Sequence, residues 1–160
     1  MVLHGRFPYL GWPRRYTPED RKIVRESMEK TGCLELEKRM MTDLSGGERQ
    51  KVYLAMALAQ DTRTIFMDEP TTYLDPAHQL AVMESVKKLR EEGKTVVMVL
   101  HDLPLAFENA DCILVMEDGK LRKEGIPEEI HRSGIIEKVF KVGLERSGKH
   151  YHIEAVQGEM

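Results

Sequence analysis

Two short apolar segments on either side of one long amphipathic segment constrain the fold of this chain most strongly. Residues 64–67 are typical of a buried strand, and residues 95–100 form a continuous run rich in β-branched side chains. The segment between them, residues 76–92, repeats apolar side chains at helical spacing: Leu80, Met83, Val86 and Leu89. Two strands joined by a helix indicate an α/β fold with a mostly parallel sheet. The unbroken apolar run also predicts that the strand at 95–100 is covered on both faces.

The other segments predict further helices and one hairpin. A helix is expected from Thr17 to about Gly32, because Thr17 can cap it and Pro18 suits its first turn. Further helices are expected at 34–39, 48–60, 104–109, 127–131 and 135–142, and a hairpin from strands at 112–116 and 121–124. Residues 1–16, which are rich in glycine and proline, are expected to form a loop, and the polar residues 145–160 receive no element.

Length and composition limit the class of protein. With 160 residues, of which 41% are hydrophobic, the chain can form a globular domain with a core. The net charge of −3 gives no basic excess, so no nucleic-acid partner is expected. No apolar run approaches the roughly 18 residues of a membrane helix, so contact with a membrane is expected only through a partner.

Polar side chains follow both predicted strands of the parallel pair. Asp68 and Glu69 come directly after the first strand, and His101 follows the second. Parallel sheets bind ligands at the carboxyl ends of their strands, and buried strands rarely end in paired acids without a cation. We therefore expect Asp68 to hold Mg²⁺ through water and Glu69 to polarise an attacking water. A strand-end cap and a structural histidine remain the alternatives.

A hydroxyl and two glycines open the predicted helix at 48–60. Successive glycines let backbone N–H groups approach a phosphate, and the helix end adds positive potential. Ser45 can add a hydrogen bond beside Gly46 and Gly47. The alternative is an ordinary capped turn before a core helix.

In their order and spacing, these motifs resemble the ATP-binding-cassette (ABC) family. Residues 45–50 are similar to its signature motif, residues 65–69 to its Walker B motif, and residues 71–75 to its D-loop. His101 is similar to its switch histidine. The resemblance implies an incomplete P-loop NTPase-like α/β ATPase domain with part of the helical subdomain.

The same resemblance implies roles in ATP hydrolysis. Asp68 would bind Mg²⁺, Glu69 would be the general base, and His101 would contact the γ-phosphate of ATP. Asp75 would lie at the seam of a dimer. The signature residues would close over the ATP held by a second ATPase subunit: Ser45, Gly46, Gly47 and Glu48. Catalysis of this kind depends on positioning and charge stabilisation.

Four segments resemble importers of iron–siderophore, haem and cobalamin complexes in particular: residues 5–8, 71–75, 99–103 and 125–130. In that group the ATPase docks under membrane permease subunits and works indirectly with a substrate-binding protein. The implied location is the cytoplasmic face of the cell membrane, as a peripheral subunit.

The chain departs from the family at the phosphate-binding loop. No GxxxxGK[ST] motif occurs, and the nearest sequence, at 93–95, has Lys88 where the first glycine belongs. The upstream glutamine loop is also missing, so the chain is expected to be N-terminally truncated and inactive alone. Its expected parts are a helical-subdomain remnant (1–44), the C-terminal part of a RecA-like core (45–143) and a tail (144–160).

Two alternatives stay open. One is a soluble, non-transport ABC ATPase acting on DNA or ribosomes, which the net charge of −3 and the lack of heptads disfavour. The other is a non-catalytic interaction module that lends its signature helix to a full-length partner and forms one composite site.

Overall fold

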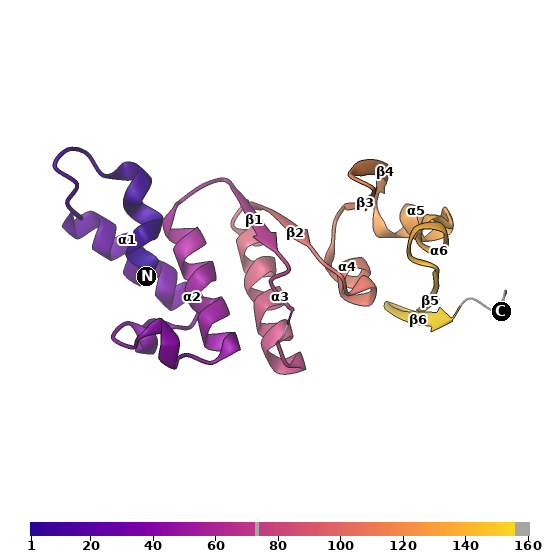
Figure 1. The fold of residues 1–160 in the computed structure, drawn as a ribbon, viewed down its shortest axis with the longest axis horizontal. Coiled ribbons are helices and arrows are strands. Elements are labelled where there is room, and N and C mark those ends of the chain that lie inside the picture. The colour runs from indigo at the N-terminus through magenta and orange to yellow at the C-terminus, as the bar shows by residue number, and fades with distance from the viewer. Residues whose placement is uncertain (73, 156–160) are drawn as a thin grey trace. The chain divides into compact units, whose positions relative to one another are not determined.

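The computed structural model describes residues 1–72 and 74–155 and divides the chain into two compact units, Met1–Val99 and Leu100–Met160. Each unit has a hydrophobic core of its own, and Figure 1 shows the helices and strands of each unit. Among the described residues, no helix is both long enough and apolar enough to cross a bilayer.

The first unit combines a helical part with a strand–helix–strand segment. Its elements, with η for a 3₁₀ helix, are η1 (Val2–Tyr9), α1 (Pro18–Lys30), η2 (Leu34–Leu36), η3 (Met41–Asp43), α2 (Gly46–Ala59), β1 (Thr64–Asp68), α3 (Pro76–Glu91) and β2 (Thr95–Val99). Strands β1 and β2 pair in parallel, and α3 lies between them in the sequence. This arrangement confirms the predicted α/β class.

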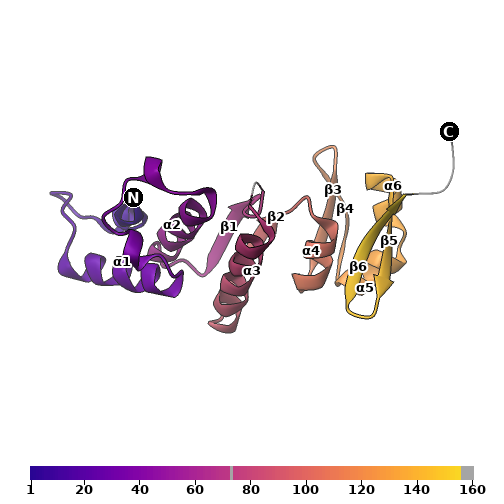
Figure 2. The same cartoon turned by 90° about the horizontal axis from the view of Figure 1, so that it is seen from below.

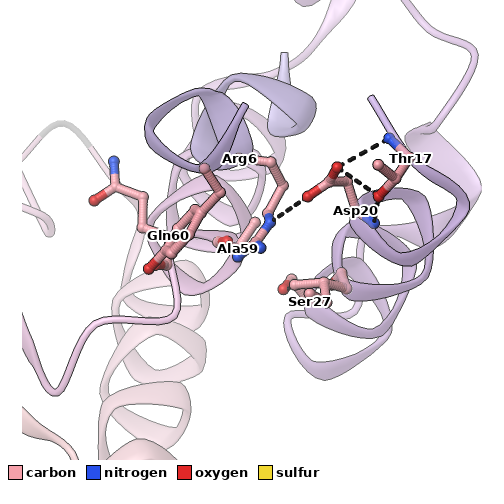
Figure 3. A network of polar contacts seen from close by, with 8 residues as sticks. Arg6, Thr17, Asp20, Ser27, Ala59 and Gln60 are labelled. Atoms are coloured by element: carbon pink, nitrogen blue, oxygen red, sulfur yellow. Dashed lines mark hydrogen bonds and ion pairs between the residues drawn. The ribbon is translucent and has the colours of Figure 1, made fainter. Parts of the chain in front are cut away.

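Helix α1 begins where the sequence predicts, because Thr17 caps it. The Thr17 hydroxyl accepts from the Asp20 N–H at 3.2 Å, and the Asp20 carboxylate accepts from the Thr17 N–H at 2.9 Å. The buried Arg6 guanidinium donates to the same carboxylate at 3.0 Å (Figure 3). These hydrogen bonds, those from Thr17 first and that from Arg6 next, lower the pKa of Asp20 to about 2.

Arg6 also joins η1 to the C-terminal end of α2. Its guanidinium donates to the Ala59 carbonyl at 3.0 Å, which satisfies an acceptor of the last helical turn (Figure 3). Gly5 allows this close approach, since a Cβ at this position would overlap the Met56 carbonyl oxygen. The prediction of a loop at residues 1–16 was therefore wrong for η1, in which Arg6 contacts a residue 53 positions away in the sequence.

Helix α2 is buried on two sides. One side joins the core of the helical part, which consists of Val2, Val24, Met28, Cys33, Leu36, Leu44, Val52, Ala55 and Ala59. The other side supplies Leu54 and Leu58, which pack with Ile65 of β1 and Leu89 of α3. The helix that follows residues 44–47 is thus held between two apolar clusters.

Strands β1 and β2 form a two-stranded parallel ribbon with α3 along one side (Figures 1 and 2). Alternate side chains of the ribbon face away from that helix: Phe66 is 77% exposed and Val99 52% exposed. The prediction that residues 95–100 are covered on both faces was wrong. A continuous apolar run cannot by itself reveal whether anything covers the second face, and within this unit only one face of β2 is packed.

The second unit carries α4 (Leu103–Asn109), β3 (Ile113–Glu117), β4 (Lys120–Gly125), α5 (Pro127–Arg132), α6 (Ile135–Phe140), β5 (Val142–Ser147) and β6 (His150–Ala155). The predicted hairpin forms as the antiparallel pair β3–β4. A second antiparallel pair, β5–β6, was not predicted: residues 145–160 received no element, and Val142, where β5 begins, was predicted to end a helix. Parallel pairing is therefore confined to β1–β2 among the described strands, and the predicted subdomain boundaries (1–44, 45–143 and 144–160) stay predictions.

Candidate functional site

Ser45 fixes the start of α2 through a reciprocal cap. Its hydroxyl accepts from the Glu48 N–H at 3.3 Å, and its own N–H donates to the Glu48 carboxylate at 2.8 Å. The sequence predicted that Ser45, Gly46 and Gly47 open this helix, and it left a capped turn as the alternative to a phosphate site; the cap is present, and the phosphate role stays a prediction. The structure therefore places this motif at a helix N-terminus, where backbone N–H groups and the helix dipole favour an anion.

The Glu48 carboxylate is held from two directions. Beside Ser45, the Arg39 guanidinium contacts its second oxygen at 2.9 Å and also donates to the Asp43 carbonyl at 2.7 Å. The Ser45 N–H and hydroxyl are the main reasons that the pKa of Glu48 lies below its ordinary value, and Arg39 lowers it further. The carboxylate thus stays ionised and keeps the loop before α2 in place.

The two glycines of this motif differ in their surroundings. Gly46 is exposed, so its backbone is open to solvent. Gly47 is buried, and a Cβ there would overlap the imidazole of His78 in α3. With the ring in this position there is no room for a Cβ at residue 47, a reason for glycine that the sequence alone does not reveal.

Asp68 and Glu69 stand at the carboxyl end of β1, as predicted. Asp68 is exposed and pairs in register with Val99, the last residue of β2. Glu69 leaves the strand in the left-handed region, with φ of 46°, so strand alternation does not set its direction. Its N–H donates to the Val99 carbonyl at 3.1 Å, and its carboxylate accepts from the Thr72 hydroxyl at 3.1 Å. Strained backbone of this kind concentrates at functional sites.

Asp75 is the N-cap of α3. Its carboxylate accepts from the His78 N–H at 3.0 Å and contacts His78 Nδ1 at 2.7 Å. The His78 N–H, followed by the His78 side chain, holds the pKa of Asp75 below its ordinary value. The predicted D-loop residues 71, 72, 74 and 75 lie between β1 and α3, and Tyr73 lies outside the described residues.

His101 belongs to the second unit, where it is exposed and stands directly before Asp102, the N-cap of α4. In sequence it follows β2, whose last residue is paired with Asp68 in the first unit. Its contact with a γ-phosphate stays a prediction, as do the catalytic and binding roles of Asp68, Glu69 and Asp75.

The acidic residues suit a metal that is shared with a phosphate. Within residues 1–72 and 74–155, no three His, Cys, Asp or Glu side chains converge on a point that could hold a metal by themselves. Mg²⁺ is commonly held by one or two carboxylates, by water and by substrate phosphates. The exposed carboxylate of Asp68 fits that kind of ligand set.

Sequence reasoning missed His78, which touches both the cap of α3 and the start of α2. One local signal was present, because a side chain three residues after an N-cap aspartate can contact the cap. Its contact with Gly47 had no signal, since the two residues lie on different helices.

Comparison with known proteins gives consistent results. Residues 7–72 match the ABC transporter family. Over 146 residues the chain is 42% identical to the petrobactin import ATP-binding protein FpuC of Bacillus anthracis, a match that covers 91% of this chain and 54% of that protein. Over 146 residues it is 41% identical to the iron(3+)-hydroxamate import ATP-binding protein FhuC of Bacillus subtilis (strain 168), with the same two coverages. The chain spans about half the length of the curated relatives it matches.

Two solved structures support the same fold. One is described as an ABC transporter of metal-chelate type in an inward-facing conformation; it matches with a TM-score of 0.84 and 25% identity over 96% of this chain and 62% of that chain. The other is cbiO1 from Clostridium perfringens, part of the ABC transporter complex cbiONQ, with a TM-score of 0.68 and 28% identity over 86% of this chain and 54% of that chain.

Proposed function

We propose that this chain, of which residues 7–72 match the ABC transporter family, is the signature-bearing and Walker B-bearing part of an importer ATPase for iron–siderophore complexes. One observation carries the proposal. The capped start of α2 presents Ser45 and Gly46 at a helix N-terminus, and the same unit carries Asp68 and Glu69 at the end of β1. The names of the relatives, which import petrobactin and iron hydroxamate, support the siderophore class over the haem or cobalamin class.

In this function Asp68 would hold Mg²⁺ through water beside the phosphates of ATP. The ion would neutralise charge on those phosphates. Glu69 would accept a proton from the attacking water, and the Thr72 hydroxyl, 3.1 Å from its carboxylate, would orient it. His101 would donate a hydrogen bond to the γ-phosphate, and Asp75 would face the second subunit.

The partners follow from the same proposal. A second ATPase subunit would supply the opposing nucleotide, and membrane permease subunits would dock on the pair, with a substrate-binding protein acting outside. The protein would lie at the cytoplasmic face of the membrane as a peripheral subunit. The capped helix at residues 45–48 would close over the ATP of the second subunit.

The sequence has no GxxxxGK[ST] motif, so the N–H groups and lysine that hold β- and γ-phosphates must come from elsewhere. We expect the 160-residue chain alone to show no sub-millimolar ATP binding in a calorimetric titration, and no hydrolysis. Sub-millimolar binding to the purified chain would contradict this part of the proposal.

A mixing experiment tests the function. The chain is added to a full-length relative whose own signature serine is replaced by arginine, so that hydrolysis requires a signature supplied in trans. We expect the wild-type chain to restore ATPase activity, and Ser45→Arg to abolish the effect. Failure of the wild-type chain to raise the rate would overturn the proposal.

The same experiment separates the ATPase from the non-catalytic interaction module. If the chain only lends its signature, Glu69→Gln restores activity as well as the wild type does. If the acids of this chain also serve a nucleotide, Glu69→Gln lowers the rate. Asp118→Asn, a change in the turn between β3 and β4, is a control with a carboxylate far from the proposed site in sequence.

A further inference from the structure

The imidazole of His78 lies against the backbone of Gly47. A Cβ at Gly47 would overlap ring atom Cδ2, and it would lie 2.5 Å from Nε2 and 2.6 Å from Cγ. A side chain at position 47 would therefore displace the ring or the start of α2. Since His78 is in the first turn of α3 and Gly47 in the first turn of α2, the ring joins the starts of two helices.

The orientation of the ring is set by Asp75. The Asp75 carboxylate accepts from the His78 N–H at 3.0 Å and lies 2.7 Å from Nδ1. An ionised carboxylate can only accept, so this contact requires a proton on Nδ1. Asp75 therefore holds one edge of the ring, and the opposite edge, Cδ2 and Nε2, faces Gly47.

The ring does not serve as filler of an apolar core. The side chain of His78 is 39% exposed and that of Asp75 is 59% exposed. Farther along the same helices, Leu54, Leu58 and Leu89 provide an apolar contact. The two helices are thus packed by leucines away from their starts, and a polar pair spaces the starts themselves.

We propose that His78 is a positioning residue that couples the D-loop to the signature motif of the same subunit. Asp75 fixes the ring, and the ring fixes the distance between the start of α3 and the start of α2. A displacement of Asp75 is thereby transmitted to residues 45–48. The consequence for hydrolysis rests on the proposed function, whereas the mechanical coupling does not.

Stability measurements on the full chain test the contact. In an otherwise wild-type chain, Gly47→Ala places a methyl group in the ring, so we expect a lower urea midpoint for the first unit. In a His78→Ala background the space is open and alanine is the better helix former, so the same change should leave the midpoint unchanged or raise it. An equal decrease in both backgrounds would overturn the proposal.

Hydrogen exchange followed by mass spectrometry gives a second readout. His78→Asn keeps a donor for Asp75 but loses the ring edge that covers Gly47. We expect exchange at residues 48–53 to become about tenfold faster in both His78→Asn and His78→Ala, a size typical of residues in direct contact. His152→Ala, which removes an exposed histidine of β6, should change nothing there. Unchanged exchange at 48–53 in both His78 variants would refute the coupling.

The mixing assay connects this coupling to function. With the wild-type chain restoring activity, His78→Asn should lower kcat about tenfold, because the signature is less well held. If the His78→Asn chain restores the same kcat as the wild-type chain does, the coupling is refuted. If the wild-type chain restores nothing, the proposed function fails, and the midpoints and exchange rates still decide whether His78 couples the two motifs.

Discussion

Gly5 and Gly11 offer a matched pair of substitutions with opposite expected signs. At Gly5 an added Cβ would overlap the Met56 carbonyl oxygen and lie 3.0 Å from the Ala59 Cβ. At Gly11 nothing lies within 4 Å of an added Cβ. Replacement by alanine therefore adds a methyl group to a packed site at Gly5 and the same methyl group to open space at Gly11.

The magnitude for Gly5→Ala follows from this geometry. Favourable carbon–carbon contacts lie at about 3.5–4.0 Å, so η1 must move away from α2 by roughly half an ångström or more. Forcing an extra methyl group into a packed site costs about 1–3 kcal/mol. The movement also stretches the Arg6 contact with the Ala59 carbonyl, now 3.0 Å. Gly11→Ala has no overlap to relieve and reduces the freedom of the unfolded chain, which stabilises by about 0.4–1 kcal/mol.

Calorimetric melting, with hydrogen exchange to assign the transition to residues 1–99, measures both changes. For a unit of this size, each 1 kcal/mol shifts Tm by about 4–8 °C. We expect Gly5→Ala to lower the Tm of the first unit and Gly11→Ala to leave it equal or slightly higher. If the Tm of Gly5→Ala lies within about 1 °C of the wild type, or Gly11→Ala lowers it equally, the account of η1 docking is wrong.

Three further predictions concern the cap, the acid limit and the second core. Ser45→Ala removes the cap of α2 and should destabilise the first unit by about 0.5–2 kcal/mol in urea unfolding, whereas Ser45→Asp, also a good cap, should not. The folded-state pKa of Asp20 is about 2, below its ordinary 3.8, so its contribution to stability is present at neutral pH and is lost as the pH falls from 3.8 toward 2. In the Asp20→Asn variant the urea midpoint should therefore depend less on pH over that range. A pH dependence equal to that of the wild type would contradict the role given to Asp20. Ile130→Ala, at a fully buried position of the second unit, should cost about 2–5 kcal/mol by urea unfolding. Ile153→Ala, at a position 52% exposed, should cost much less, and similar losses for the two would contradict the assigned core.

Much of the fold could be predicted because its signals are local. Helix α1 starts at a Thr–Pro cap, α3 repeats leucine and methionine at helical spacing, and the turn at 117–120 lies between two strand patterns. The β5–β6 hairpin escaped prediction because most of its side chains are polar and exposed. Only Leu144 and Tyr151 are buried in it, and Tyr151 packs against Phe107 with tilted rings whose centroids are 5.1 Å apart.

The candidate site divides in the same way. The cap formed by Ser45 and Glu48 is contained within four residues, so a capped turn at this helix start could be considered from the sequence alone. Glu69 has a positive φ and donates its N–H to the Val99 carbonyl of the neighbouring strand, and no local pattern indicates either feature. The contact of His78 with Gly47 requires two helices to be placed side by side. Such contacts depend on tertiary packing, which periodicity does not report.

The exposed face of the β1–β2 ribbon has a practical consequence. This face exposes three apolar side chains next to strand backbone: Phe66, Val97 and Val99. Exposed apolar side chains on an uncovered strand promote aggregation. The isolated chain should therefore aggregate as its concentration rises, which increases turbidity, and it should increase the fluorescence of a dye that binds apolar surface. Inside a cell, the lifetime of the chain would depend on how quickly another protein surface covers these apolar side chains and so protects them from chaperones and proteases.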